Sequence, residues 1–321
     1  MILVLLVLLC LPATGQQLPT FSQYVLNGFI LNPAMAGFDG YTSVSTTARQ
    51  QWVGFGDAPQ TVAASWQTRV LQRSYRIVEN PVRDRNMLLP STKGRVGLGA
   101  YIINDVNGNM ARTGVQFTYA YHIIINHNQL SFGLAGKVFQ YRLDADALSF
   151  GRGDESQLLN SFKETAYTPD VDFGIYWTNT VYFIGLSANN LFQPAVRIGS
   201  DNSRENKILR HYWLMGGYKI NTLSDFSFEP TVLVKTTEKW IPQADIGAKV
   251  YYVDDYWAGL AYRTDGSLLV QMGMRTSGLF IGYAFDYSFS SIQRFSYGSH
   301  EISISYKFGD NARRYRWLRR Y

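Results

Sequence analysis

The segment Leu279-Phe280-Ile281-Gly282-Tyr283-Ala284-Phe285-Asp286-Tyr287 decides the fold class. Its odd positions are large and apolar, whereas most of its even positions are small or charged. The segments 115–123 and 301–308 repeat this alternation. Because side chains on one face of a β-strand recur at every second residue, each segment predicts a strand with one apolar and one polar face.

Fourteen segments show this pattern: residues 42–54, 59–71, 94–104, 113–125, 129–143, 170–177, 181–190, 210–220, 226–236, 242–252, 256–263, 267–275, 279–289 and 300–308. Each is about as long as a tilted strand needs to be to cross a bilayer, and an even number is typical of bacterial single-chain barrels. The sequence therefore predicts an all-β fold, a single-chain outer-membrane antiparallel β-barrel of about 14 strands.

The composition excludes other classes of protein. The chain has 321 residues, of which 46% are hydrophobic, 15% aromatic and only 17% charged, and its mean hydropathy is -0.13. The aromatic content excludes a disordered chain, and after the first dozen residues no stretch of about 20 apolar residues predicts a membrane helix. A soluble β-sandwich would turn polar residues outward, whereas a nearly charge-free apolar face in almost every segment favours a barrel in lipid.

Residues 1–15 predict a secretory signal peptide, with Ala13 and Gly15 as its cleavage signature before Gln16. A lipoprotein signal that uses Cys10 is the alternative, but Leu9 stands where a small residue is required. Cys10 is the only cysteine, so the mature chain has none. A small secreted domain held by disulfides is therefore excluded.

Connection lengths indicate the orientation of the barrel. Tight turns of Asn, Asp, Ser, Thr and Gly alternate with longer links over 144–169, 191–209 and 290–299. Outer-membrane barrels place short turns in the periplasm and long loops outside the cell, so both chain ends are expected in the periplasm. The link 72–93 is long but falls on the periplasmic side, and we interpret it as an added contact surface.

Residues 16–40, which precede the predicted barrel of residues 41–308, show no strand alternation and contain Gly28, Asn32, Pro33 and Gly37. Two interpretations stay open for this segment. It forms a plug inside the lumen, or it caps the periplasmic mouth.

If the apolar positions face lipid, the polar positions supply the lumen with charges of both signs. Six are basic and five acidic: Lys137, Lys235, Lys249, Arg263, Arg275 and Lys307, with Asp172, Glu229, Asp245, Asp286 and Glu301. Ion-selective pores are typically lined by a ring of one sign. The balanced set instead predicts an ion-pair network or a lumen filled by polypeptide, with an outer-membrane porin or solute channel as the alternative function.

The C-terminal residues 309–321 form a basic tail that follows the last predicted strand. Five arginines are concentrated there: Arg313, Arg314, Arg316, Arg319 and Arg320. Arginine at this density, with aromatic neighbours, favours an anionic or aromatic partner, and membrane headgroups are an equal alternative. An exported barrel excludes nucleic acid as the partner despite a pI of about 9.2.

Enzymatic chemistry has little support in the sequence. The four histidines are His122, His127, His211 and His300, and their spacing nominates no nucleophile and base. The oxygen-rich segment 105–109 could hold calcium, but it lacks the distal Glu of a calcium loop, and Asn-Gly is an ordinary hairpin turn. We therefore predict no catalysis, no cofactor and no metal site.

Several blocks of the sequence match the pattern of one known family. Phe21 to Tyr24 (FSQY) and Leu31 to Gly37 (LNPAMAG) resemble the opening of the PorP/SprF family of Bacteroidota outer-membrane proteins. The likeness continues through Arg49 to Phe55 (RQQWVGF), Ala58 to Thr61 (APQT) and Pro169 to Gly174 (PDVDFG). It covers nearly the whole mature chain.

The resemblance implies a non-enzymatic barrel of the type IX secretion system, which exports proteins to the cell surface and in some members supports gliding adhesins. One branch is implied to couple the periplasmic ring of lipoproteins and a peptidoglycan-binding partner to the outer membrane. The other assists export or surface attachment of a secreted protein.

Partner-binding candidates fall in three places. Asn32, Pro33 and Gly37 are expected to fix the N-terminal segment. The first outer hairpin is expected to be shaped by Trp52, Gly54, Phe55 and Pro59. The arginines of the tail form the third group.

Overall fold

The computed structural model describes residues 21–24, 26, 28–70, 95–125, 128–143, 165–196, 206–222 and 225–309. The predicted signal peptide, the link 72–93 and the tail beyond Gly309 lie outside the described residues. Fourteen long strands form the wall: β1 (Thr42–Gln50), β2 (Gln60–Val70), β3 (Val96–Asn107), β4 (Met110–Ile125), β5 (Asn128–Leu143), β6 (Thr165–Thr178), β7 (Tyr182–Asn189), β10 (His211–Tyr218), β12 (Phe226–Thr237), β13 (Gln243–Tyr252), β14 (Tyr256–Arg263), β15 (Ser267–Thr276), β16 (Leu279–Ser288) and β17 (Ser299–Phe308).

Short elements complete the description: α2 (Gly28–Leu31), η1 (Pro33–Met35), β8 (Ala195–Val196), β9 (Asn206–Lys207), β11 (Ile220–Asn221) and η3 (Ser291–Phe295). Within the part of the chain that the structure describes, no helix has the length and apolar character needed to cross a bilayer.

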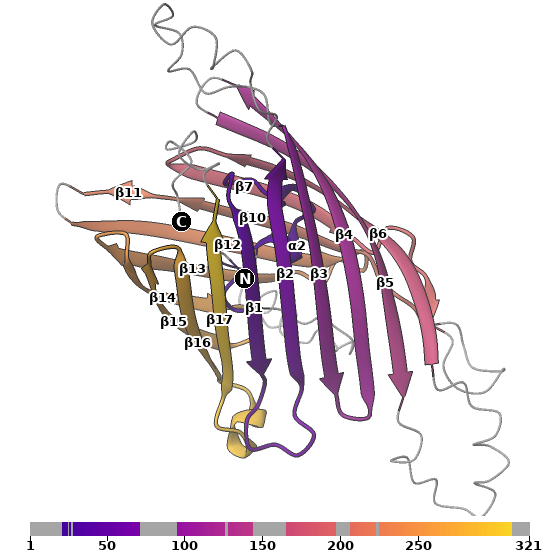
Figure 1. Ribbon diagram of the computed structural model, residues 1–321. Coiled ribbons are helices and arrows are strands. Elements are labelled where there is room, and N and C mark those ends of the chain that lie inside the picture. Colours follow the sequence, from indigo (N-terminus) through magenta and orange to yellow (C-terminus); the bar gives the residue numbers. More distant parts are fainter. Residues whose placement is uncertain are drawn as a thin grey trace, which may run out of the picture.

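The wall is a closed antiparallel cylinder (Figure 1). Strands adjacent in sequence pair with each other, β10 pairs with β12, and β1 pairs with β17 in a register from Thr42↔Phe308 to Gln50↔His300. Closure leaves no free sheet edge in lipid, which is the condition for a sheet to span a membrane. The predicted 14-stranded outer-membrane barrel is confirmed.

Strand ends differ from the sequence expectation where polar residues continue a strand. β3 and β4 extend to a hairpin at Gly108, whose φ is +57°, although apolar alternation stops earlier in both. Asp105 and Arg112 pair across this extension at 3.7 Å. β1, in contrast, ends at Gln50, because Trp52 has a φ of +47° and leaves the extended conformation.

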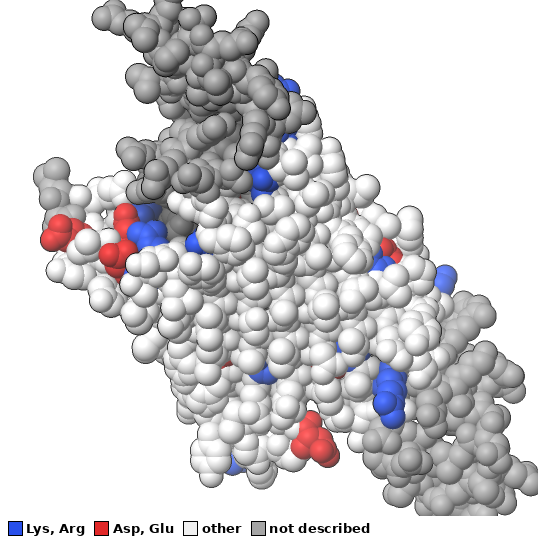
Figure 2. Space-filling view, in the orientation of Figure 1, with Lys and Arg blue, Asp and Glu red and all other residues white. Residues whose placement is uncertain are grey.

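Burial alternates along every strand and separates the two faces. Outward residues such as Phe117, Leu134 and Ile246 are exposed to 71%, 55% and 60%. The outward positions of the described wall strands hold one charged residue, Arg142, which lies at the end of β5. Figure 2 shows this wall largely free of charge, with charged atoms mainly toward the two ends. Such a surface suits hydrocarbon outside and places the polar face in the lumen.

The N-terminal segment, meaning the described residues between 21 and 40, lies inside the cylinder. All of them are buried except Leu26 and Ile30, which are half-buried. Phe21, Phe29 and Phe38 pack there with wall residues such as Tyr176 and Trp213 in one hydrophobic core. The segment is therefore packed against the inner face of the wall.

Candidate functional site

The site that the fold creates is the lumen together with the N-terminal segment in it. At one end of the segment, the Glu301 carboxylate accepts hydrogen bonds from the backbone N–H groups of Ser22 and Gln23, at 2.7 and 2.9 Å. Arg49 forms ion pairs with Glu301 at 3.0 Å and with Asp286 at 2.7 Å, and it also donates to the Ser22 hydroxyl. The Ser22 hydroxyl donates to Asp286 at 2.6 Å. We call these five residues the anchor cluster.

The middle of the segment is held by side chains that reach backbone atoms. Asn32 Nδ2 donates to the carbonyls of Ile175 and Leu186, and Asn32 Oδ1 accepts from Ala34 N at 2.9 Å, which starts the short helix η1. Ser187 donates to the Leu31 carbonyl at 2.8 Å. These bonds satisfy polar groups that burial would otherwise leave unpaired.

Tyr24 is held by a side chain of strand β12. Its hydroxyl donates to Thr231 Oγ1 at 3.0 Å. Burial raises the pKa of the Tyr24 phenol, so that the group stays neutral and keeps its proton for this bond.

At the other end, the segment approaches β1 through Gly37, which has a φ of +64°. Gly37 N donates to Gln67 Oε1 at 3.1 Å, and the Phe38 carbonyl accepts from Gln129 at 3.0 Å. Asp39 forms an ion pair with Lys307 at 2.9 Å. The segment is thus bound at both ends and in the middle.

Glycines on the inward face of the wall make room for the segment. A Cβ atom at Gly97 would lie 1.9 Å from the Ala36 carbonyl oxygen, one at Gly133 2.2 Å from Ala34 N, and one at Gly174 2.0 Å from Asn32 Oδ1. These three glycines belong to β3, β5 and β6. No larger residue fits there while the segment is in place.

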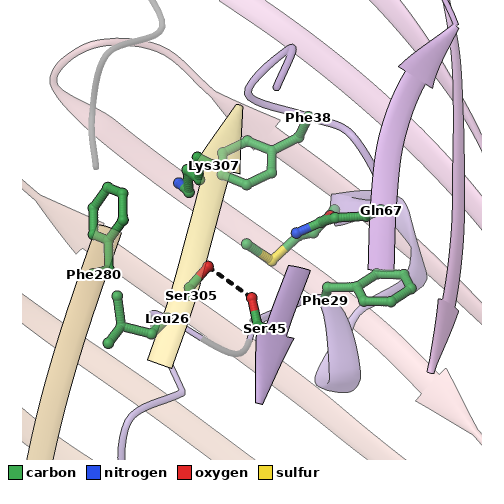
Figure 3. A pocket seen from close by; sticks show the side chains of 10 residues that line it. Leu26, Phe29, Phe38, Ser45, Gln67, Phe280, Ser305 and Lys307 are labelled. Carbon is green, nitrogen blue, oxygen red and sulfur yellow. Dashed lines mark hydrogen bonds between the residues drawn. The ribbon is translucent and has the colours of Figure 1, made fainter. Parts of the chain in front are cut away.

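A small cavity of about 20 Å³ remains between the segment and the wall. The residues around it include Leu26, Phe29 and Phe38 of the segment and Ser45, Ser305 and Lys307 of the wall (Figure 3). This volume is about that of one water molecule. The packing around the segment is therefore close to complete in this region.

The predicted lumen charges lie on inward positions, and several form close pairs. Lys137 and Asp172 are 2.5 Å apart, and Arg263 contacts Asp245 through two bonds of 2.8 Å. Arg263 also lies 3.5 Å from Asp286, which joins this pair to the anchor cluster.

The remaining lumen charges have other neighbours. Lys249 lies opposite Glu229 in the β12–β13 register and 4.7 Å from the Trp257 ring centre. Lys235 lies 5.5 Å from the Trp213 ring centre. Arg275 is half-buried at the end of β15, where it pairs with Asp255 and lies 5.9 Å from the Phe280 ring centre.

The first outer hairpin is joined to the loop between β16 and β17. Val53 N donates to the Gly298 carbonyl at 2.8 Å, and Tyr297 N donates to the Val53 carbonyl at 2.7 Å. Trp52 is half-buried, Gly54 and Phe55 are exposed, and Pro59 is buried. Asn32, Pro33 and Gly37 are buried in the lumen. The five tail arginines lie outside the described residues.

One close pair was not expected from residue spacing. Ser131 lies 2.8 Å from His122 Nδ1, and His122 Nε2 lies 3.0 Å from the Ala36 carbonyl, to which it donates. Both side chains are fully buried, so the histidine holds the segment and the serine orients the histidine. Among the described residues, no group of three or more His, Cys, Asp or Glu is arranged to hold a metal ion.

The chain matches one protein family and is similar to several solved structures. The family "Type IX secretion system membrane protein PorP/SprF" matches residues 13–306. No curated protein matches the chain. Omp33 of Acinetobacter baumannii is similar in fold, with a TM-score of 0.43 and 6% identity over 84% of this chain and 98% of that one.

The toluene transporter TbuX of Ralstonia pickettii gives a TM-score of 0.48 and 10% identity over 87% of this chain and 92% of its own. A mutant of the Rh. blastica porin gives a TM-score of 0.33 and 8% identity over 84% of this chain and 99% of its own. The likeness to these structures concerns the fold alone.

Proposed function

Because the chain belongs to the PorP/SprF family of type IX secretion system membrane proteins, we propose that it is a non-enzymatic barrel that anchors periplasmic secretion machinery or assists the export or surface attachment of a secreted protein or gliding adhesin. The protein is located in the outer membrane, as its family and its apolar barrel wall require. Its partners are then lipid and components of that secretion system.

The contacts between the N-terminal segment and the inner face of the wall carry this proposal. A solute channel needs a continuous wet path lined by side chains that favour the solute. Here the N-terminal segment contacts inward residues of strands on opposite sides of the cylinder, from Glu301 on β17 to Ser187 on β7. Close ion pairs take up charges that a pore would present to solute. This arrangement supports an interaction role over a porin or solute channel.

The same contacts support a plug rather than a cap for residues 16–40. A cap would contact only one rim of the barrel. The described part of this segment instead reaches from Glu301, near the start of β17, to Lys307, near its end. We therefore assign the plug role to it.

Two surfaces suit the two proposed roles. The periplasmic rim, with the link 72–93 and the basic tail 309–321, would bind the secretion ring or a peptidoglycan-binding lipoprotein. The opposite rim, where Phe55 and Tyr297 are exposed on joined loops, would contact a secreted protein. Exposed aromatic side chains on hydrogen-bonded loops are suitable anchors for a protein partner.

The decisive experiment is purification of the tagged full-length chain from native membranes in mild detergent, followed by identification of bound proteins. An unrelated outer-membrane barrel with the same tag is the matched control. We expect secretion components or a surface protein to be enriched over the control. Enrichment of ring lipoproteins assigns the anchoring role, and enrichment of an exported protein assigns the export role. A preparation without either would contradict the proposal.

A further inference from the structure

The seam between β1 and β17 is where the first barrel strand meets the last. The lumen face of this seam carries no apolar side chain; its eight residues are Ser43, Ser45, Thr47, Arg49, Glu301, Ser303, Ser305 and Lys307. Two hydroxyl pairs bridge it, Ser45 with Ser305 at 2.7 Å (Figure 3) and Thr47 with Ser303 at 2.9 Å. Neutral hydrogen bonds of this kind contribute little each.

Closing this seam joins distant parts of the chain. Arg49 and Glu301 are 252 positions apart in the sequence, whereas most neighbouring strands of the wall are joined by a single connection. Ordering such a long intervening chain has a high entropic cost, so contacts across this seam form late. An additional interaction across the β1–β17 seam would therefore have the largest effect on closure of the barrel.

The anchor cluster provides one such interaction. Arg49 belongs to β1, Asp286 to β16 and Glu301 to β17, and Ser22 of the N-terminal segment contacts all three side chains. Removing the segment would take two backbone donors from the buried Glu301 carboxylate and one hydroxyl donor from Asp286. Both carboxylates would then compete for Arg49, which is unfavourable in a buried site.

The second interaction lies at the other end of the seam. Asp39 pairs with Lys307 on β17, while Gly37 N donates to Gln67 on β2. These contacts reach strands on either side of β1. From them we infer that the N-terminal segment is a latch that holds the first and last strands together, so that closure of the barrel is coupled to seating of the segment.

Thermal unfolding of the full-length protein in detergent tests the latch through rescue by a disulfide. Residue 10 is the only cysteine of the chain, so an engineered pair has no competitor after signal cleavage. Glu301→Gln weakens the anchor cluster, and Asp172→Asn weakens a buried ion pair of β5 and β6 away from the seam. Each change is combined with Ser45→Cys/Ser305→Cys across the seam, or with Thr118→Cys/Ala135→Cys, which face each other on β4 and β5.

A latch predicts a specific pattern of rescue. The seam disulfide should reverse most of the decrease in thermal midpoint caused by Glu301→Gln and little of the decrease caused by Asp172→Asn. The β4–β5 disulfide should reverse neither decrease. Equal rescue of both variants by the seam disulfide, or of Glu301→Gln by both disulfides, would show general stabilisation and overturn the latch.

Amide hydrogen exchange of the milder variant Ser22→Ala keeps the inference testable if Glu301→Gln does not fold. We expect exchange of the β1 and β17 amides to accelerate by about tenfold, with β4 and β5 unchanged. Faster exchange around the whole barrel, or no change at the seam, would contradict the latch. Neither measurement depends on secretion, so failure of the latch can be distinguished from failure of the proposed function.

Discussion

Lys137 Nζ lies 2.5 Å from Asp172 Oδ1, and both side chains are buried in the lumen wall. The two residues are diagonal rather than opposite, because the β5–β6 register places Lys137 across from Asp170. Asp172 also accepts a hydrogen bond from Asn190 N at 2.9 Å. A buried charge that loses its partner is destabilising, whereas a neutral pair of similar size is tolerated.

We therefore predict that Lys137→Met lowers the free energy of unfolding by about 3–5 kcal/mol. The double variant Lys137→Met/Asp172→Asn should recover most of that loss, because the amide is uncharged and still accepts from Asn190. Denaturant unfolding of the two single variants and the double variant in detergent measures the coupling. Additive losses would show that the ion pair is not coupled in the folded barrel.

Two glycines on one strand give a matched pair of substitutions. Gly133 faces the N-terminal segment, where a Cβ would meet Ala34 N at 2.2 Å, whereas a Cβ at Gly136 meets nothing within 4 Å. We expect Gly133→Ala to destabilise the protein by about 1–3 kcal/mol through overpacking, and Gly136→Ala to leave stability nearly unchanged. Thermal midpoints of the two variants test this. Equal midpoints would mean that the segment does not press on β5.

The fold could be predicted from the sequence because every strand of a barrel in lipid turns its apolar residues outward and its polar residues inward, the reverse of a soluble protein. Leu134 and Ile246 face outward and Asp172 faces inward, and this alternation is visible without a structure. Strand ends were less predictable where the strands leave the membrane. Asp105 and Arg112 extend a hairpin through their own ion pair, so apolar alternation no longer marks its limits.

The site could be predicted only in part. The pattern indicated eleven charged residues at inward positions, but the set left out Arg49, Arg69 and Asp170, which are buried at inward positions too. Pairing depends on strand register and tilt, which alternation does not encode. Ser22, Gln23 and Arg49 belong to the blocks that carry the family resemblance, and no local sequence pattern links them to Glu301. Ser131 and His122 are nine positions apart on adjacent strands, a contact that only the β4–β5 register reveals. Arg49 offered one signal, as a charged residue at an inward position of a strand.

The lipid-facing wall predicts that the cost of a new charge depends on its depth. Leu134 is an exposed outward residue in the middle of β5, and Gln140 is an outward residue near the end of the same strand. Leu134→Arg should lower stability by about 2–4 kcal/mol, and Gln140→Arg by about 0–1 kcal/mol. The yield of folded barrel in membranes and its unfolding in detergent are the measurements. A larger loss for Gln140→Arg would mean that the membrane boundary is placed wrongly.

The basic tail is predicted to act in binding and not in assembly. Deleting residues 309–321 removes five arginines but no part of β17, which ends at Phe308. We expect the deleted chain to reach the outer membrane in normal amounts and to retain less periplasmic partner in pull-downs, since arginine-rich contacts rely on charge. In the full-length chain, that retention should also weaken as salt increases. Pull-downs that do not change after the deletion would exclude the tail as a contact.

The plug assignment makes a prediction about ion conduction. If the N-terminal segment is a plug, the full-length protein should show no steady conductance in planar bilayers, because the segment contacts the wall from the anchor cluster to Lys307. Deleting residues 16–38 should produce a steady conductance, provided that the shortened chain still folds, as judged by its shift in electrophoretic mobility. Gly174→Val provides an independent route, since its side chain would compete for the position of Asn32 Oδ1, 2.0 Å from a Cβ at this glycine. The tail deletion is the matched control and should stay silent. If the full-length protein conducts as well as the deletion of residues 16–38, the segment does not block the lumen, and the porin function becomes the better explanation.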